Sequence, residues 1–481
     1  MHTKPWRWHD HISINLFWLG LNIRNTAVGS VFLPYLVDMF VSGEVKNTAL
    51  GAMRTAGLII AMLAQPAMGL LSDRNTSRFG RRRPFIFVGV LLDLIFLAAV
   101  GMAGSYWALL AAILLLQFSS NISHGALQGF IPDLAPEDQR GRASGVKAIM
   151  ELLPLILVGF TVGQLVGAGQ LGWAVVATCA GLFVTMVLTM ILVRETPLAA
   201  RPTTPLGPPL LRVLGMLAGI GMGAAAGLIA GGLLGGLTGL IVWPLAGAGP
   251  ARAWGVGVGG LVAMAAAVVV GVWAGALATL GPAARRQSSF TWWVVNRLLF
   301  LAAVTSIQGS APYFLMHAFS LTREAAVATA SLMTAAAGVF TIVTALPAGW
   351  LADRFGHRML VGVSGVIASL GTFIMVSTMW FPNQALVYLA GGVIGLASGL
   401  FMTINWALGA ELAPAAEAGR YLGVSNLAGA GAGMVGAGIG GVLADYLNAY
   451  QPGLGYFAIF SCYGILLLLS VVSLAGVKRG R

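Results

Sequence analysis

Charged side chains are scarce in this sequence of 481 residues. Asp, Glu, Lys and Arg make up 9% of it and hydrophobic residues 58%, with a mean hydropathy of +0.87. Soluble domains carry about 25% charged residues, so this deficit excludes an ordinary soluble domain. The composition is typical of a polytopic membrane protein.

Cysteine and catalytic motifs are nearly absent as well. The two cysteines, Cys179 and Cys462, lie within apolar runs, which predicts small buried residues and not a disulfide or a metal site. No Gly-x4-Gly-Lys-Ser/Thr phosphate loop occurs, and His124 has no nucleophile or second histidine at the spacing of a triad or a metal site. We therefore expect neither an enzyme nor a protein with a cofactor or a bound metal.

The net charge of +12 reflects membrane topology. If the apolar runs are spans and the N-terminus is cytoplasmic, most of the 27 lysines and arginines fall at cytoplasmic ends, whereas Lys46, Arg252 and Arg323 fall outside. This asymmetry follows the positive-inside rule. It predicts a multi-pass protein of the cell membrane with both termini in the cytoplasm, and no nucleic-acid partner. The first apolar run continues to about Phe40, which predicts a retained span and not a signal peptide.

Apolar runs of about 20 residues or more are long enough to cross a bilayer core of about 30 Å. They predict about 14 transmembrane helices, over 13–38, 47–71, 84–104, 106–131, 142–168, 171–193, 210–246, 253–281, 289–318, 325–351, 359–380, 384–410, 421–445 and 455–476. The predicted architecture is an all-α membrane protein. It has an N-terminal six-helix bundle at 1–193, a linker with two additional Gly/Ala-rich spans at 194–286, and a C-terminal six-helix bundle at 287–481.

The two halves of the chain repeat one another. The stretch from Asp133 to Pro136 returns as Glu411 to Pro414, with Leu-Ala-Pro in both, and Pro34-Tyr35 returns as Pro312-Tyr313. Both pairs have the same spacing of 278 residues. Two similar bundles in one chain are typical of secondary transporters.

A basic turn separates the second and third apolar runs. The stretch from Gly69 to Pro84 holds five arginines and one aspartate, and a shorter copy follows from Gly349 to Arg358. The turn resembles the loop Gly-x-Leu-Ala-Asp-Arg-x-Gly-Arg-Arg of the major facilitator superfamily, and its longer form is similar to that of plant sucrose carriers and their bacterial relatives. The matching residues are Gly69, Asp73, Arg74, Gly80, Arg81 and Arg82 in the first copy and Asp353, Arg354, Gly356 and Arg358 in the second.

This resemblance implies a major facilitator fold that works by alternating access. Asp73 would pair with arginine and cap a neighbouring helix, so that the turn forms a conformational latch, closed in one state and released in the other. The alternative is that the arginines only fix orientation through their positive charge.

Polar side chains within spans are costly in lipid and are therefore candidates for function. Gln117, Asn121, His124 and Gln128 share one helical face, which predicts a stripe along water or substrate; polar contacts between packed helices are the alternative. Arg24 and Arg297 each lie beside an asparagine, and their guanidinium groups can donate to sugar hydroxyls; internal salt bridges are the alternative. Trp406 lies beside Asn405 and offers a stacking face next to an amide; an interfacial anchor is the alternative. The candidate substrate-binding residues are Asn22, Arg24, Asn25, Gln117, Asn121, His124, Gln128, Asn296, Arg297, Gln308, Asn405 and Trp406.

Lys147 and Glu151 are one helical turn apart in the fifth span and can pair along one face. Glu151 is about 15 Å from the helix start at Gly141, near the midplane, where scarcity of water favours the neutral acid and a nearby cation favours the carboxylate. We predict these two residues as the proton-coupling site; a permanently ionised structural pair is the alternative. Asp93 is interpreted as a structural partner of Arg54 or of another neighbour.

The leading hypothesis is a secondary active transporter that takes up a sugar, a glycoside or a similar polar solute with protons. Its expected partners are a small-molecule substrate, protons and the lipid bilayer, and we expect a monomer. One alternative is a 14-span proton-driven exporter of lipophilic compounds, although Leu153-Pro154-Leu155 stands where drug antiporters have a Gly-Pro-x-x-Gly-Gly run. The other is a non-transporting membrane receptor or assembly factor on the same fold.

Overall fold

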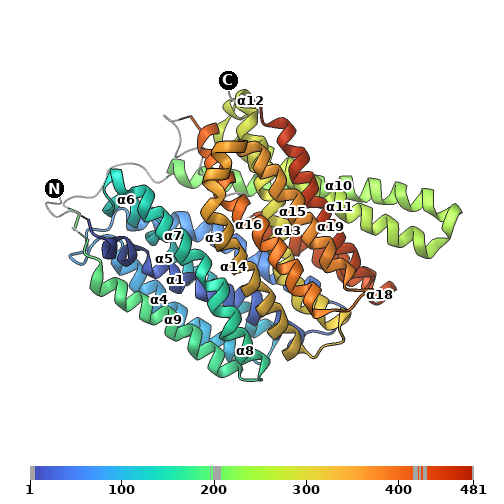
Figure 1. The fold of residues 1–481 in the computed structure, drawn as a ribbon, viewed down its shortest axis with the longest axis horizontal. Coiled ribbons are helices and arrows are strands. Elements are labelled where there is room, and N and C mark those ends of the chain that lie inside the picture. The colour runs from blue at the N-terminus through green and yellow to red at the C-terminus, as the bar shows by residue number, and fades with distance from the viewer. Residues whose placement is uncertain are drawn as a thin grey trace. The chain divides into compact units, whose positions relative to one another are not determined.

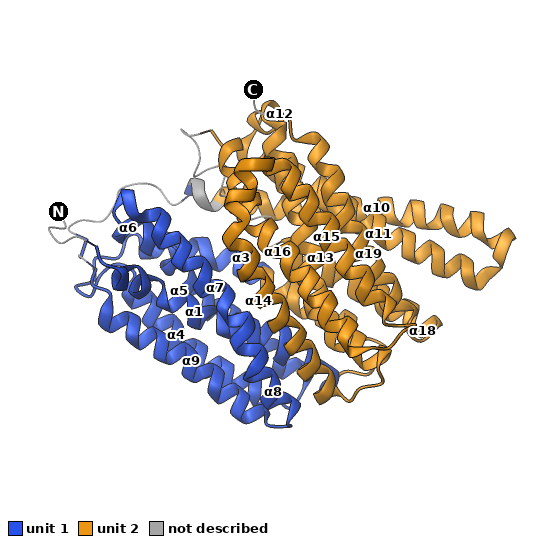
Figure 2. Cartoon of the chain, viewed as in Figure 1, with its two compact units in different colours: residues 1–40, 59–210 blue, residues 41–58, 211–481 orange. Residues whose placement is uncertain are grey.

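All regular secondary structure is helical in the part of the chain that the computed structural model describes, and no strand occurs there (Figure 1). The described residues are 6–195, 197–198, 207–414, 421, 424–425, 429 and 431–478. The chain divides into two compact units (Figure 2): Met1–Phe40 with Ile59–Leu210 form unit 1, and Val41–Leu58 with Leu211–Arg481 form unit 2. The predicted all-α class is confirmed.

Unit 1 encloses an apolar core. Its elements are α1 (Trp8–Thr26), the π-helix η1 (Ala27–Phe32), α2 (Leu33–Phe40), the second part of α3 (Lys46–Ser72), α4 (Arg83–Gly101), α5 (Tyr106–Leu127), α6 (Phe130–Leu134), the 3-10 turn η2 (Glu137–Gln139), α7 (Arg140–Phe160), α8 (Val162–Gly167) and α9 (Leu171–Leu192). Phe17 of α1, Val90 of α4, Phe130 of α6 and Leu182 of α9 are fully buried in this core. Because α1 packs on α7 and α9, polar residues on α1 and α7 are brought close together.

Unit 2 begins with the first part of α3 and resumes at Leu211, near the start of α10. Its further elements are α10 (Gly207–Ala246), α11 (Ala248–Leu280), α12 (Ala283–Arg286), α13 (Ser288–Ala318), α14 (Arg323–Phe355), α15 (His357–Ser377), α16 (Gln384–Leu412), the π-helix η4 (Met434–Ile439), α18 (Gly440–Tyr450), α19 (Leu454–Ser473) and the 3-10 turn η5 (Leu474–Gly476). In its core, the rings of Phe300 on α13 and Phe401 on α16 stack at 3.6 Å.

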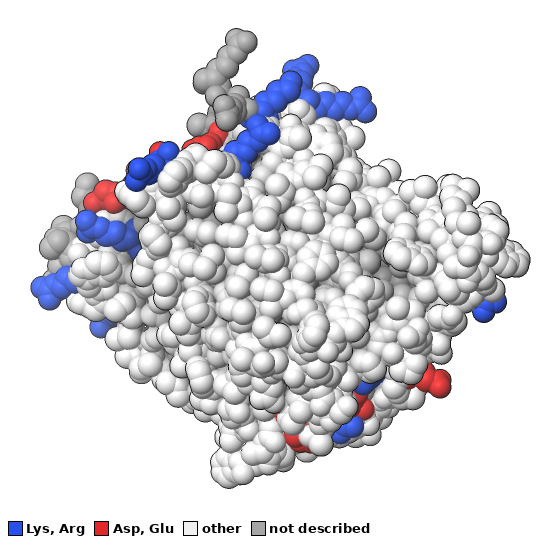
Figure 3. All heavy atoms as spheres, turned by 45° about the vertical axis from the view of Figure 1, so that its right-hand side comes forward, with Lys and Arg blue, Asp and Glu red and all other residues white. Residues whose placement is uncertain are grey.

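Twelve helices of the described residues are long and apolar enough to cross a membrane. They match twelve of the predicted runs. The first run, 13–38, forms α1, η1 and α2 and is interrupted by the π-helical turn, while 421–445 lies partly outside the described residues. The count of about 14 spans therefore stays a prediction. Uncharged side chains cover most of the face shown in Figure 3, as lipid requires of a multi-pass protein.

The two additional spans form a tight helical hairpin, α10 and α11 (Figure 1). Glycines recur every four residues along one face of α10, at Gly219, Gly223, Gly227, Gly231 and Gly235. A Cβ atom on any of them would lie about 2.5 Å from backbone of α11. Small residues at this spacing let two helix backbones touch in lipid. The turn is a single residue at φ +83°, Gly247, so Arg252 lies within α11 and not in the turn expected from the sequence.

We expect Gly231→Leu to force the hairpin apart. A side chain there meets the backbone oxygen of Gly259 at 2.5 Å, and such overpacking costs about 1–3 kcal/mol. The matched control is Gly232→Leu, because the neighbouring glycine has nothing within 4 Å of its Cβ position. Thermal unfolding in detergent should show a lower midpoint for Gly231→Leu alone. Equal midpoints for the two variants would contradict the glycine contact.

Candidate functional site

A buried ion pair connects α1 to α4 in unit 1. The guanidinium of Arg24 lies 3.6 Å from the carboxylate of Asp93, and the two side chains are 2% and 0% exposed. Ser119 of α5 also donates a hydrogen bond to Asp93. Arg24 is thus held by protein groups, which favours the salt-bridge alternative over ligand contact. The sequence predicted Arg54 or another neighbour as the partner of Asp93, and the structure places Arg24 beside it.

The asparagines near Arg24 on α1 also form hydrogen bonds. Arg24 donates to the side-chain oxygen of Asn25 at 2.8 Å, and the Asn22 amide donates to the backbone oxygen of Trp18 at 2.9 Å. Because a side chain bonded to its own helix has less capacity for a ligand, Asn22 is a weaker substrate candidate than its position suggested. Asn25 remains exposed.

The polar stripe of α5 is shorter than the sequence predicted. Gln117, Asn121 and His124 lie on the helix, whereas α5 ends at Leu127 and Gln128 is its exposed C-cap residue. The Asn121 amide donates to the backbone oxygen of Gln117 at 2.7 Å. This bond leaves Gln117 and His124, both half-buried, as the side chains of the stripe best placed for a solute.

His124 and Lys147 contact the ring of Trp18, and Glu151 pairs with Lys147. The Lys147 ammonium lies 4.1 Å from the ring centroid, and the His124 ring meets the same indole edge-on at 5.4 Å. Glu151 lies 3.4 Å from the Lys147 ammonium, and the pair is 31% and 37% exposed. The structure therefore places the predicted proton-coupling pair on α7 against residues of α1 and α5. Trp18 was not predicted, because its position in an apolar run gave no sign of this role.

In unit 2, a chain of hydrogen bonds orders the candidates of α13 and α16. The Asn296 amide donates to the Ser470 backbone oxygen at 2.8 Å, and the Asn405 amide donates to Asn296 at 2.9 Å. Arg297 in turn donates to the Asn405 oxygen at 3.1 Å. The two asparagines are 0% exposed, so they hold the arginine in place and cannot themselves contact a solute.

The arginine at the end of this series of hydrogen bonds lies beside an exposed tryptophan. Trp406 is 45% exposed, and the guanidinium of Arg297 lies 5.1 Å from its ring centroid. Asn405 accepts from one guanidinium nitrogen, and the remaining N–H groups are available to hydroxyl oxygens. Gln308 is on the same face of α13 but 11 residues further on, about 16 Å away, so the structure does not bring it to the arginine.

The basic turn between α3 and α4 forms a closed network within unit 1. Arg82 pairs with Asp73 at 2.8 Å and with Asp133, and Arg81 also donates to Asp133 at 3.1 Å. The Arg82 guanidinium packs so closely on Gly129 that a Cβ there would clash with it. Gly80 has φ +100°, a conformation that glycine adopts without strain. The predicted pairing of Asp73 with arginine is present.

Glu195, after α9, completes this network. Its carboxylate accepts hydrogen bonds from the backbone N–H groups of Arg82 and Arg83, each at 3.0 Å, and so caps the start of α4. Burial raises the pKa of Glu195, while these two hydrogen bonds act in the opposite direction. The sequence offered no sign of this contact, because Glu195 is more than 100 residues from the turn.

The second copy of the turn is held differently. His357 Nδ1 lies 3.0 Å from Glu411 Oε1, in the place of the pair between Arg81 and Asp133. Gly356 has φ +86° and ends α14. Arg354 packs over the rings of Trp350 and Phe355. Asp353 and Arg358 make no ion pair with any residue that the structure describes.

A contact outside the predicted set caps the start of α3. Asp445 of α18 accepts hydrogen bonds from the backbone N–H of Asn47 at 3.3 Å and of Thr48 at 2.6 Å, and from the Asn47 amide at 2.7 Å. An acid at a helix N-terminus is stabilised by the free N–H groups and by the helix dipole. The residues are almost 400 positions apart, beyond the reach of sequence periodicity.

We expect Asp73→Asn to slow the conformational cycle and to leave substrate affinity nearly intact, because the network lies in the turn and not among the candidate binding residues. Exchange rates and equilibrium binding, measured on the same preparation, check this. The control is Asp138→Asn, which removes an acid from the neighbouring turn η2 that makes no ion pair with a described residue. A fall in affinity parallel to the fall in rate would contradict the separation of latch and binding site.

Comparison with known proteins identifies two family models in this chain. Residues 16–244 match the model "MFS/sugar transport protein", and residues 297–480 match "Major Facilitator Superfamily". Human "Proton-associated sugar transporter A" is 32% identical over 168 residues, which cover 29% of this chain and 22% of that protein. A sucrose transport protein of Arabidopsis thaliana is 28% identical over 156 residues, covering 28% of this chain and 25% of its own.

Solved structures confirm the fold. The POT family transporter PepTSo superposes with a TM-score of 0.67 over 98% of both chains at 13% sequence identity. At this identity the likeness concerns the fold alone. The chain spans about a quarter of the length of the curated relatives it matches.

Proposed function

Since the chain belongs to the major facilitator superfamily, we propose that it is a secondary active transporter that takes up a sugar, a glycoside or a similar polar solute together with protons. The observation that carries this proposal is the match of residues 16–244 to a sugar transport model. The names of the proton-associated and sucrose transporters among its relatives support the same solute class and coupling ion.

The substrate side of the proposal rests on Arg297 and Trp406. A half-exposed indole presents an apolar face to the C–H surface of a sugar ring, and the guanidinium beside it donates to hydroxyl oxygens. The buried asparagines behind Arg297 set the direction of these donors before a solute arrives. Such preorganisation lowers the cost of binding. Within unit 1, Gln117 and His124 are the side chains of the polar stripe best placed to contact a solute.

The proton side rests on Glu151 and Lys147. In the ionised pair, the carboxylate is balanced by the ammonium at 3.4 Å. When a proton binds Glu151, the attraction disappears, and Lys147 keeps its contact with the Trp18 ring. Because Trp18 also contacts His124 of the polar stripe, a change at the acid reaches residues proposed to bind solute. We propose that this link couples proton binding to solute binding.

We further propose that the protein acts as a monomer in the cell membrane, with both termini in the cytoplasm. The arginine-rich turns between α3 and α4 and between α14 and α15 support this orientation, because such residues are retained on the cytoplasmic side. The network of Asp73, Arg82, Asp133 and Glu195 would then lie at that surface. It would hold one conformation of the cycle and break in another.

Uptake by proteoliposomes tests the proposal. Labelled mono- and disaccharides and an aryl glucoside are supplied under an inward pH gradient, beside dye efflux from vesicles with the same protein. Saturable sugar uptake that an uncoupler abolishes is the expected result. Dye efflux without sugar uptake would assign the chain to lipophilic export, and the absence of either flux would favour the non-transporting alternative.

A further inference from the structure

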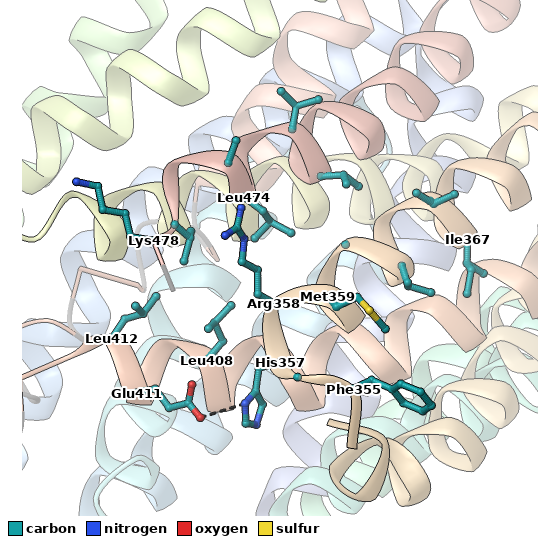
Figure 4. A pocket seen from close by; sticks show the side chains of 18 residues that line it. Phe355, His357, Arg358, Met359, Ile367, Leu408, Glu411, Leu412, Leu474 and Lys478 are labelled. Atoms are coloured by element: carbon teal, nitrogen blue, oxygen red, sulfur yellow. Dashed lines mark ion pairs between the residues drawn. The ribbon is translucent and has the colours of Figure 1, made fainter. Parts of the chain in front are cut away.

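An open pocket on unit 2 is separate from every residue proposed above to bind solute or protons. It has a volume of about 1050 Å³ and lies between α15, the ends of α16 and α19, and η5. Its lining begins at Gly356 and His357, where α15 starts, and reaches Val366 and Ile367. Val366 and Ile367 lie about 14 Å further along α15 than its first residues. The pocket thus runs from the end of the unit into its apolar flank (Figure 4).

The flank beside this pocket has the exposure of a lipid-facing surface. Met359, Val363, Val366, Leu370 and Phe373 recur every three or four residues on α15, and each is 38% to 58% exposed. Such a row places one apolar helix face outside the protein core. The inner part of the pocket is therefore open to hydrocarbon, and its walls are aliphatic.

The mouth of the pocket is basic. Arg358 extends across the pocket beside Leu474, and Lys478 lies at the mouth (Figure 4). Neither side chain is paired with a carboxylate of the described residues. Glu411 is the acid among the described lining residues, and its partner is His357 at 3.0 Å. Among the residues that the structure describes, no carboxylate neutralises these two cations.

The first turn of α15 adds to this positive field. Its N-cap is Gly356, with no side-chain hydrogen bond at the cap, and the helix continues for 21 residues. The free N–H groups and the helix dipole favour an anion at such an end. Two cations with no carboxylate partner in the described part of the chain, a helix N-terminus and an apolar groove of this size together match one kind of ligand: an anionic headgroup joined to acyl chains.

We propose that this pocket binds an anionic phospholipid of the surrounding leaflet, with its phosphate between Arg358, Lys478 and the start of α15 and an acyl chain along Val363, Val366 and Val471. A zwitterionic lipid offers the same chain but carries its own cation at the headgroup, and the pocket should discriminate against it. Free inorganic phosphate lacks the apolar part and should bind much more weakly.

Native mass spectrometry of the full chain, released from detergent, tests the site with phosphatidylglycerol and phosphatidylcholine as probes. The wild type should retain phosphatidylglycerol preferentially. Each of Arg358→Gln and Lys478→Gln should weaken that binding about fivefold, and the double variant by more than tenfold. The control is Arg212→Gln, which removes an exposed cation of α10 that does not line the pocket; it should bind as the wild type does.

A second variant tests the apolar part without changing charge. A Cβ on Gly362 would lie 3.6 Å from Leu474 and Val471, an ordinary contact, so Gly362→Leu should fold and fill the groove. It is expected to lose phosphatidylglycerol, while Gly236→Leu on α10, with open space at its Cβ position, is expected to retain it. Equal retention of the two lipids by the wild type, unchanged binding by the double variant and Gly362→Leu, or equal thermal stabilisation by inorganic phosphate would each overturn the proposal.

Discussion

Replacement of Glu151 by glutamine is expected to abolish accumulation of the solute against its gradient. Glutamine has the shape of the protonated acid and can neither take up nor release a proton, so the step that couples the two fluxes is lost. With one proton per solute, a gradient of one pH unit sustains about tenfold accumulation, and the variant should lose all of it. Uptake under an imposed pH gradient measures this loss directly.

Counterflow in the same vesicles separates coupling from folding. The Glu151→Gln protein should still exchange labelled for unlabelled solute at equal pH, because the solute site is intact. Glu137→Gln is the matched control: it removes a carboxylate that is 89% exposed and lies 3.8 Å from Arg140, and it should accumulate solute normally. If Glu151→Gln still concentrates solute with an unchanged pH profile, the pair with Lys147 is structural and Asp93 becomes the next carboxylate to test.

Replacement of Arg297 by glutamine is expected to raise KM steeply and to change kcat less. A hydrogen bond to a charged donor contributes about 1.5–3 kcal/mol, which corresponds to about 10- to 150-fold in affinity. Asn296 and Asn405 remain bonded to each other and to Ser470 in this variant, so the fold should persist. Initial rates of uptake as a function of solute concentration provide KM and kcat.

Trp406, beside Arg297, offers an independent test of this part of the binding site. Trp406→Ala should weaken binding by removing the aromatic face, and Trp406→Phe should restore most of it because a ring is retained. Trp243→Ala is the control, since this tryptophan is 60% exposed and lies at the end of α10, a helix that carries none of the candidate binding residues. Normal KM values for both Arg297→Gln and Trp406→Ala would exclude this part of unit 2 from the binding site.

Local spacing made part of the site predictable. Lys147 and Glu151 are four residues apart on one helix, and the ion pair follows from helical periodicity. The basic turn was recognised from its glycines, aspartate and arginines, and the pairing of Asp73 with arginine is present in the structure. The composition was also enough to predict an all-α membrane protein, because apolar runs of this length are typical of membrane-spanning helices.

Contacts between residues far apart in the chain could not be predicted from the sequence. Arg24 and Asp93 are polar residues in separate apolar runs, and no periodicity connects them; only packing of α1 on its neighbours shows that they pair. The same holds for Asp445 at the start of α3 and for Glu195 at the start of α4. The role of Trp18 was not predicted for another reason. In the sequence, a tryptophan among apolar residues cannot be told from an ordinary core residue, and only the structure shows that Lys147 lies against its ring.

The current that accompanies solute addition tests proton-coupled transport most directly. Proteoliposomes adsorbed on a solid-supported membrane are exposed to a sugar jump at equal pH on both sides, with no other ion gradient. The proposed mechanism predicts a transient inward positive current that saturates with sugar concentration and disappears in Glu151→Gln. Saturable sugar uptake with no current in the wild-type protein would contradict proton coupling.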